Sequence, residues 1–351
     1  MKPQLYHHNL PFSLEAGGTL PAITIAYHTW GKLNDQKDNV IWICHALTAN
    51  SNAADWWKGM IGPGLAFDTD RYFVICANIL GSVYGTTGPV DPDPASGQPY
   101  FHKFPLITIR DMVNAHELLR GHLGIQKIFL LAGGSMGGYQ VLEWTLMQAQ
   151  LIEKQFLIAT SARETPWGIA IHTAQRLAIE ADNTWEKGGA GAGAKGLAAA
   201  RAIGMLTYRG YHAFMSTQSE PGNEKLDDFK ASSYIKYQGD KLTRRFNAYS
   251  YYMLSKALDS HNIARGRGES IESVLQTIEQ PTLVMGISSD LLCPVDEQKL
   301  IASNIPGSRY LEFDSPFGHD GFLVETAIIS TQLMEWLEMN KTGEQLVTRK
   351  G

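Results

Sequence analysis

A serine flanked by glycines is the residue of this sequence best placed to do chemistry. The segment Gly133-Gly134-Ser135-Met136-Gly137 has the spacing G-x-S-x-G. It comes after an apolar run typical of a buried strand and opens a stretch with helical periodicity. A turn this sharp tolerates little beyond glycine beside the serine, and it exposes the serine hydroxyl above a helix N-terminus. The pattern predicts that Ser135 is a nucleophile; the alternative is a glycine-rich turn with a structural role only.

The base that such a serine needs is predicted to be His319. A serine hydroxyl is a poor nucleophile at neutral pH, and after this kind of turn the acidic residue and then the histidine follow along the chain. His319 lies in a loop between the last predicted strand and the last predicted helix. His172, His212 and His261 fall within a helical stretch, so they are poor candidates. The alternative for His319 is a loop histidine that caps a turn.

The acidic partner is predicted to be Asp290, which follows the preceding predicted strand. Its carboxylate would hold the imidazole in one tautomer and stabilise the imidazolium that forms. Asp296 competes for this role. Because Asp296 follows Pro294 and precedes a helix-like run, helix N-capping explains it adequately.

Acyl chemistry at a serine also requires donors for the oxyanion. One is predicted to be the backbone N–H of Met136, directly after the nucleophile, and the second should come from the loop after an earlier strand. Leu47 lies in such a loop, directly behind the apolar run 40–44. His45, in the same loop, is expected to shape the turn.

Short apolar runs that do not alternate with polar residues must position these side chains. Strands buried on both faces of a parallel sheet have this pattern. Helix-like stretches at 111–123 and 136–149 lie between some of the runs, which indicates a right-handed α/β architecture. The runs cover residues 40–44, 72–77, 127–132, 155–159, 281–286 and 309–313.

A helical insert is predicted to interrupt the sheet. From Trp167 to about Thr277 the periodicity is mostly helical, and residues 188–194 are too rich in glycine to hold a helix. The predicted catalytic core therefore consists of residues 1–166 and 278–351, and the helical lid insert consists of 167–277. A closing amphipathic helix is expected from about 321 to 338.

The composition is that of a soluble globular protein. The 351 residues are 44% hydrophobic and 19% charged, with a net charge of −5, which argues against nucleic acid or an anionic membrane as partner. No apolar leader or run long enough for a membrane span is present, so a cytoplasmic location is expected. Cys44, Cys76 and Cys293 are widely spaced. Buried packing is therefore expected for them, and no metal site is predicted.

Many short motifs in one order resemble the homoserine O-acetyltransferases of the α/β-hydrolase type, over residues 10–335. The resemblance implies an α/β-hydrolase fold and transfer of an acetyl group from acetyl-CoA to the side-chain hydroxyl of L-homoserine, through a Ser135 acyl-enzyme, in methionine biosynthesis. It also implies a cytoplasmic homodimer formed through the lid, with acetyl-CoA as co-substrate and no metal or other cofactor. The motifs are residues 45–48, 56–57, 61–64, 68–73, 85–89, 133–138, 142–144, 161–163, 166–167, 237–241 and 318–323.

Three further residues are candidates for holding the acceptor. Arg201 and Tyr208 lie about two turns apart on one face of an apolar helical stretch. A buried guanidinium needs an anionic partner, which from the sequence alone is either a core carboxylate or a substrate carboxylate. The resemblance favours the homoserine carboxylate for both residues. Asp320 could pair with the substrate ammonium, or cap the last helix, or do both.

Other functions stay open at this point. Ala49-Asn50, Tyr139 and Thr86 depart from the residues usual in the family, which keeps succinyl-CoA open as the acyl donor and hence a homoserine O-succinyltransferase. An esterase or thioesterase would use the same triad with water as acceptor. A non-catalytic interaction protein is disfavoured because the G-x-S-x-G turn and the catalytic triad positions Ser135, Asp290 and His319 are all intact.

Overall fold

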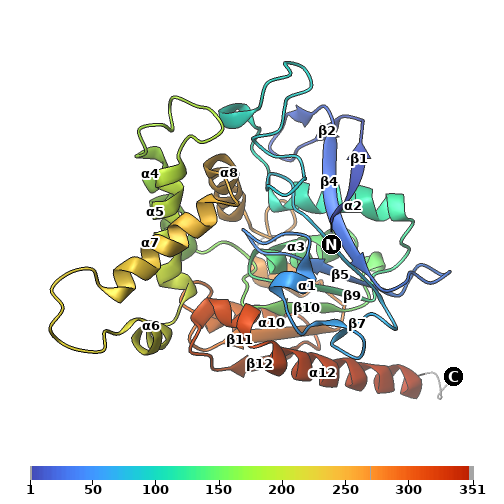
Figure 1. Ribbon diagram of the computed structural model, residues 1–351. Coiled ribbons are helices and arrows are strands. Elements are labelled where there is room, and N and C mark those ends of the chain that lie inside the picture. Colours follow the sequence, from blue (N-terminus) through green and yellow to red (C-terminus); the bar gives the residue numbers. More distant parts are fainter. Residues whose placement is uncertain (1, 269, 348–351) are drawn as a thin grey trace.

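The computed structural model describes residues 2–268 and 270–347, and its centre is a sheet of eight strands (Figure 1). The strands that run parallel to one another occupy the positions of the predicted apolar runs, so the α/β class with a mostly parallel sheet is confirmed. In their order across the sheet they are β8 (Phe73–Ala77), β5 (Val40–Cys44), β9 (Leu130–Gly134), β10 (Gln155–Ile158), β11 (Thr282–Ile287) and β12 (Arg309–Phe313).

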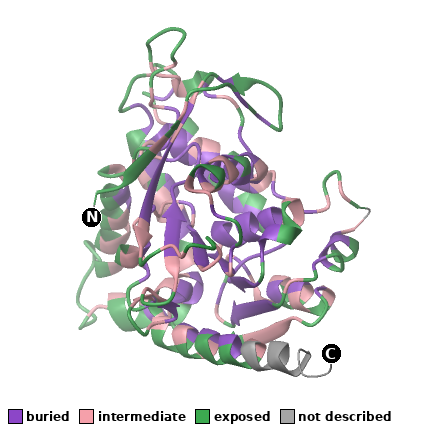
Figure 2. Ribbon diagram, turned by 90° about the vertical axis from the view of Figure 1, so that its right-hand side faces the viewer, coloured by how far each residue is buried: buried purple, intermediate pink, exposed green. Residues whose placement is uncertain are grey.

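Helices cover both faces of this sheet, which is why its strands are apolar throughout. Successive side chains of β5 point to opposite faces, so Trp42 belongs to one core cluster and Ile43 to the other. Figure 2 shows the central strands buried and the exposed residues on the outer elements. The Trp42 face packs against α2 (Ile109–Leu123), α3 (Met136–Met147) and α10 (Val295–Asn304), and the Ile43 face packs against α1 (Ala53–Trp56) and α12 (Thr326–Val347).

Two antiparallel strands extend the sheet at its N-terminal edge, and the sequence analysis missed both. β4 (Ile23–Trp30) pairs with β8, and β1 (Gln4–His8) pairs with β4. β1 is mostly exposed and polar, so it has no apolar run to mark it. Two small two-stranded sheets complete the β-structure: β2 (Phe12–Ser13) with β3 (Thr19–Leu20), and β6 (Ile61–Gly62) with β7 (Phe67–Asp68).

Among the described residues between β10 and β11, all the named elements are helices. Figure 1 shows α4, α5, α7 and α8 gathered beside the sheet, where α4 packs against α5 and α8. The division into a core of 1–166 and 278–351 and a lid of 167–277 stays a prediction, and residues 1, 269 and 348–351 of it lie outside the described residues. The helices are α4 (Pro166–Glu180), α5 (Ala194–Tyr208), α6 (Tyr211–Gln218), α7 (Lys230–Thr243), α8 (Ala248–Asp259) and α9 (Ile271–Leu275).

The closing helix differs from the prediction. Residues 321–338 are not one helix, because α11 (Gly321–Val324) has its C-cap at Glu325 and α12 begins at Thr326. Of the loop predicted at 188–194, residues 188–193 are outside any helix, whereas Ala194 is already the first residue of α5. In the part of the chain that the structure describes, no helix has the length and apolar character required to cross a membrane.

Candidate active site

The turn at Ser135 joins β9 to α3 at the carboxyl end of the sheet. Ser135 has a φ of 54°, in the left-handed region that side chains other than glycine rarely adopt. The neighbouring positions 133 and 137 must be glycines, because a side chain at either one would clash with nearby backbone atoms. A Cβ on Gly133 would lie 2.4 Å from the carbonyl carbon of Gly137, and a Cβ on Gly137 would lie 2.1 Å from the carbonyl oxygen of Cys44. The sharp turn that the sequence predicted is therefore present, and it holds the serine in a strained conformation.

His319 lies within hydrogen-bonding distance of both Ser135 and Asp290. His319 Nε2 is 2.9 Å from Ser135 Oγ, and His319 Nδ1 is 2.7 Å from Asp290 Oδ2. The other carboxylate oxygen of Asp290 accepts hydrogen bonds from the backbone N–H groups of Leu292 and Cys293. In the tautomer that this arrangement favours, Nδ1–H donates to Asp290 and Nε2 accepts the serine proton.

The electrostatics of the imidazole suit proton transfer. Burial lowers the pKa of His319, but the charge and hydrogen bond of the adjacent Asp290, together with the charges of Asp320 and Glu164, raise it by more. The net pKa therefore lies above the ordinary histidine value of 6.5. The negative carboxylate therefore stabilises the imidazolium that forms when the ring takes a proton from Ser135.

The competing residues have other partners or positions. Asp296 is in the first turn of α10, whose N-cap is Pro294, so the capping role expected for Asp296 is wrong. A carboxylate in the first turn still interacts favourably with the helix dipole. His172 binds Asp259, with Nδ1 2.8 Å from Oδ1. His261 is buried behind Tyr139 and His212 is exposed.

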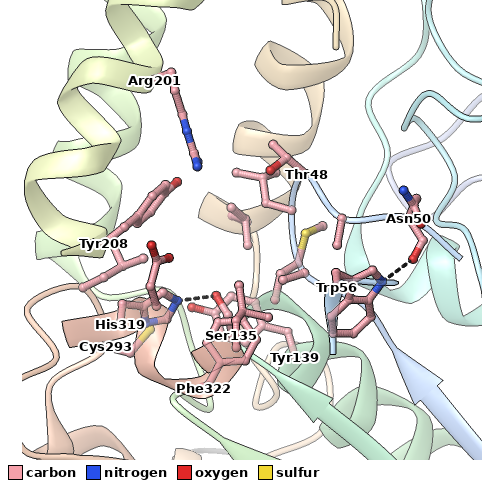
Figure 3. Close-up of a pocket in the computed structure, with 18 of the residues that line it drawn as sticks. Thr48, Asn50, Trp56, Ser135, Tyr139, Arg201, Tyr208, Cys293, His319 and Phe322 are labelled. Atoms are coloured by element: carbon pink, nitrogen blue, oxygen red, sulfur yellow. Dashed lines mark hydrogen bonds between the residues drawn. The ribbon is translucent and has the colours of Figure 1, made fainter. Parts of the chain in front are cut away.

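A cavity of about 410 Å³ opens above Ser135, between the sheet and the insert (Figure 3). Leu47 and Met136 line this cavity beside the nucleophile. Within residues 2–268 and 270–347, neither of their backbone N–H groups has a hydrogen-bond acceptor. Two unused donors beside a nucleophile are the arrangement that an oxyanion hole requires.

Arg201 and Tyr208 reach the same cavity from α5. Figure 3 shows the Arg201 guanidinium pointing into the cavity, and its Cζ lies 5.1 Å from the centre of the Tyr208 ring. The Tyr208 ring centre is 6.1 Å from that of His319. Among the residues described, no carboxylate forms an ion pair with Arg201. Within the described part of the chain, no internal salt bridge therefore accounts for the Arg201 charge that faces the cavity.

Asp320 also lines the cavity, but it is engaged in a way that the sequence analysis did not predict. Its Oδ2 lies 2.8 Å from Nε of Arg209, the residue after α5. Burial raises the pKa of Asp320, while the charge of Arg209 opposes that rise. Asp320 stands at the N-cap position of the short helix α11, yet its side chain makes no capping hydrogen bond.

The cavity wall contains further polar residues that the sequence analysis missed. The Tyr139 hydroxyl donates to Glu164 Oε2 at 3.0 Å, and burial raises the pKa of this carboxyl. His172 lies in the same wall, and Lys241 and Arg245 come from α7 and the segment behind it. Lys241 ends the motif 237–241 and Tyr139 directly follows the motif 133–138, but the spacing of neither motif assigns these side chains a chemical role. Glu164, His172 and Arg245 lie outside the motifs.

Asp290, Cys293 and His319 also offer three ligand atoms close enough for a metal ion, within 4.8 Å of one another. The Asp290 and His319 atoms are already joined by the hydrogen bond at 2.7 Å. Burial raises the pKa of the Cys293 thiol well above its usual value, which disfavours the thiolate that a metal would need. The triad arrangement therefore accounts for these residues better than a metal centre.

The fold and the site define the chain as an α/β hydrolase. Residues 39–326 match the family model described as the alpha/beta hydrolase fold. An esterase E22 structure superposes with a TM-score of 0.87 over 96% of this chain and 99% of that one, but at 23% identity it supports the fold alone.

Closer relatives identify the family within this class. The homoserine O-acetyltransferase of Cyclobacterium marinum is 46% identical over 325 residues, 93% of this chain and 92% of that protein. The homoserine O-acetyltransferase of Chlorobaculum parvum is 48% identical over 331 residues, with the same coverage. The homoserine O-acetyltransferase structure from Bacillus anthracis superposes with a TM-score of 0.90 at 26% identity, over 96% of this chain and 98% of that one. The chain belongs to the homoserine O-acetyltransferase family, as its motifs predicted.

Proposed function

We propose that this protein transfers an acetyl group from acetyl-CoA to the side-chain hydroxyl of L-homoserine, giving O-acetyl-L-homoserine and CoA for methionine biosynthesis. Relatives that are 46–48% identical over nearly the whole chain carry the name of this activity. The observation that carries the proposal is the cavity itself, where a hydrogen-bonded Ser-His-Asp set lies beside a guanidinium that has no ion-pair partner among the described residues. An amino-acid acceptor supplies the missing carboxylate.

The first half-reaction acetylates Ser135. Its Oγ attacks the thioester carbonyl carbon of acetyl-CoA, and His319 Nε2 takes the hydroxyl proton across the 2.9 Å contact. The backbone N–H groups of Leu47 and Met136 are the proposed donors to the oxyanion of the tetrahedral intermediate. When the intermediate collapses, the C–S bond breaks, and the CoA sulfur leaves with the proton that His319 holds. Asp290 stays ionised throughout and keeps the ring oriented.

The second half-reaction transfers the acetyl group to the acceptor. The homoserine hydroxyl attacks the acetyl-serine carbonyl while His319 removes its proton. Collapse of this intermediate breaks the bond to Ser135 Oγ, and His319 returns the proton to the serine. We assign the homoserine carboxylate to Arg201 and Tyr208, and its ammonium to Asp320. Because Arg209 neutralises part of the Asp320 charge, the ammonium competes with an existing ion pair at 2.8 Å.

The proposal is tested by the rate of CoA release in a matrix of donors and acceptors. Acetyl-CoA and succinyl-CoA are each supplied alone, with homoserine and with serine. We expect a stoichiometric burst of CoA from acetyl-CoA alone and sustained release only when homoserine is added. Sustained release from acetyl-CoA without homoserine indicates a thioesterase instead. Faster release from succinyl-CoA than from acetyl-CoA identifies the homoserine O-succinyltransferase.

We also propose a homodimer formed through the helical insert, as the family resemblance implies. Apolar side chains stand exposed on and between α5 and α6, which supports this assembly: Leu206 is 61% exposed, Tyr211 68% and Met215 50%. Light scattering should give twice the chain mass for the wild type and a smaller mass for the double variant Tyr211→Glu, Met215→Glu. A monomeric wild type contradicts the proposal. The cytoplasmic location stays a prediction.

A further inference from the structure

A buried glutamine connects the two backbone segments that carry the proposed oxyanion donors. Gln140 lies on α3 and is 0% exposed. Its Nε2 is 3.0 Å from the carbonyl oxygen of His45 and 3.2 Å from the carbonyl oxygen of Met136. An amide nitrogen carries two N–H donors, so one is available for each carbonyl. The side-chain oxygen of Gln140 has no partner among the described residues, so this amide acts through its donors alone.

These two carbonyl groups belong to the two backbone segments that carry the proposed oxyanion donors. Met136 itself supplies one proposed donor, and His45 lies two residues before Leu47, which supplies the other. The amide cannot be reversed, because its oxygen would then face two carbonyl oxygens at hydrogen-bond distance. Gln140 therefore connects the loop after β5 to the first turn of α3.

Further contacts hold the loop after β5. Nδ1 of His45 lies 2.9 Å from the carbonyl oxygen of Ala46, and Nε2 lies 3.0 Å from Oδ1 of Asn78 and 3.2 Å from the backbone nitrogen of Ile79. Burial lowers the pKa of His45 to about 4, so the ring is neutral and can both donate and accept. Behind the loop, the α carbon of Gly137 contacts the Cys44 carbonyl so closely that no side chain fits. Gln140 completes this set of contacts from the α3 side.

We propose that Gln140 is a positioning residue that sets the distance between the Leu47 and Met136 N–H groups. This inference rests on one part of the proposed function, the role of these two N–H groups as oxyanion donors. Donors act on the transition state when their nitrogens lie about 2.7–3.1 Å from the position of the oxyanion, and losing one costs about 10²- to 10³-fold in kcat. A shift of the loop that leaves both donors in place should lower kcat by less than the loss of a donor. We expect Gln140→Met, which keeps the volume and removes the donors, to lower the Ser135 acetylation rate about 10- to 100-fold.

A second buried glutamine provides the matched control. Gln155 on β10 is also 0% exposed, and its amide donates to Thr282 Oγ1 at 2.8 Å and accepts from Thr145 Oγ1 at 3.0 Å. It does not line the cavity. Gln155→Met should lower the melting temperature in the same way as Gln140→Met, because each leaves buried polar groups unpaired. Only the Gln140 variant should alter catalysis.

The experiment compares both variants with the wild type in three measurements: the Ser135 acetylation rate, the KM for homoserine, and the affinity for a boronic acid that forms a tetrahedral adduct with Ser135. The proposal predicts that Q140M loses acetylation rate and boronate affinity while KM for homoserine stays within about twofold, and that Q155M keeps all three. The isosteric Q140E, with the same shape and one donor when protonated, should lie between Q140M and wild type. If Q140M unfolds, Q140E carries the test.

Two outcomes overturn the proposal. One is a Q140M or Q140E enzyme that keeps the wild-type acetylation rate and boronate affinity. The other is an equal catalytic loss in Q155M at the same melting temperature, which would show that stability alone is responsible. If the wild type does not acetylate homoserine, the acetylation rate is measured with 4-nitrophenyl acetate. Failure of the proposed function and failure of this inference then remain distinguishable, because any acyl chemistry at Ser135 uses the same donors.

Discussion

The substitution Arg201→Lys separates acceptor binding from the rest of the reaction. The guanidinium faces the cavity, has no carboxylate partner among the described residues, and lies over the Tyr208 ring at 5.1 Å. Arginine binds a carboxylate through two parallel N–H donors, whereas lysine offers a single point of contact. Lysine keeps the positive charge, so the change removes the bidentate geometry and little else.

The expected magnitude follows from the hydrogen bonds that are lost. A hydrogen bond to a charged group contributes about 1.5–3 kcal/mol, and each 1.4 kcal/mol is about tenfold in an equilibrium or rate ratio. We therefore expect kcat/KM for homoserine to fall about 10- to 100-fold. The rate of Ser135 acetylation by acetyl-CoA should stay unchanged, because the acceptor is absent from that step. The melting temperature should change little, since no buried carboxylate loses its partner.

The assay measures homoserine kcat/KM, the acetylation rate and the melting temperature on one preparation. Arg176→Lys is the matched control: Arg176 also lies in the insert and pairs with Asp259 at 2.6 Å, but it does not line the cavity. Its homoserine kinetics should equal those of the wild type. Unchanged homoserine kinetics in R201K would refute the binding role. So would equal losses in both half-reactions together with a large drop in melting temperature, which would make Arg201 part of the scaffold.

Three other predictions concern the nucleophile, the base and the cavity wall. Ser135→Ala should retain the fold and give no acetyl adduct by intact mass after incubation with acetyl-CoA; a variant that still turns over normally would exclude the triad. Since Asp290 holds the pKa of His319 above 6.5 and only the neutral ring can accept a proton, the acetylation rate should fall as the pH drops through that raised value. Asp290→Asn should move this acidic limb of the pH–rate profile to lower pH and reduce kcat roughly 10⁴-fold. An acidic limb at the same pH would show that another group titrates. Tyr139→Phe leaves the Glu164 carboxyl without its hydroxyl donor and should lower the free energy of unfolding by about 1–3 kcal/mol in a urea titration; an unchanged midpoint would mean that water replaces the hydroxyl.

The sequence alone was sufficient for the parallel strands and for the chemistry at their ends. Val40–Cys44 is apolar at every position because helices cover both of its faces, and that requirement is visible in the residue types. Gly133 and Gly137 are required by contacts within the turn and with the adjacent strand, so the turn at Ser135 can be recognised from the sequence. Once Ser135 was assigned, the order of strands along the chain led to Asp290 and His319.

Elements without a dense apolar pattern were not predictable in this way. β1 is a mostly exposed edge strand that pairs with β4, and its polar residues resemble a loop. The closing helix was predicted as one element because Gly321 and Thr326 fall in a continuous amphipathic pattern. The side chain of Glu325 instead accepts a hydrogen bond from Ser315 at the break between α11 and α12.

Which side chains meet in the cavity was decided by the tertiary structure. Arg209 follows α5 by sequence and gives no sign that it will pair with Asp320, which is more than a hundred positions away. The same holds for Gln140 and the His45 carbonyl, and for Tyr139 and Glu164. Local sequence constrains local geometry through sterics and burial, so motifs with internal contacts are readable from it. Hydrogen bonds between distant segments depend on distances of a few ångströms, and those distances are set only when the strands, helices and insert pack against one another.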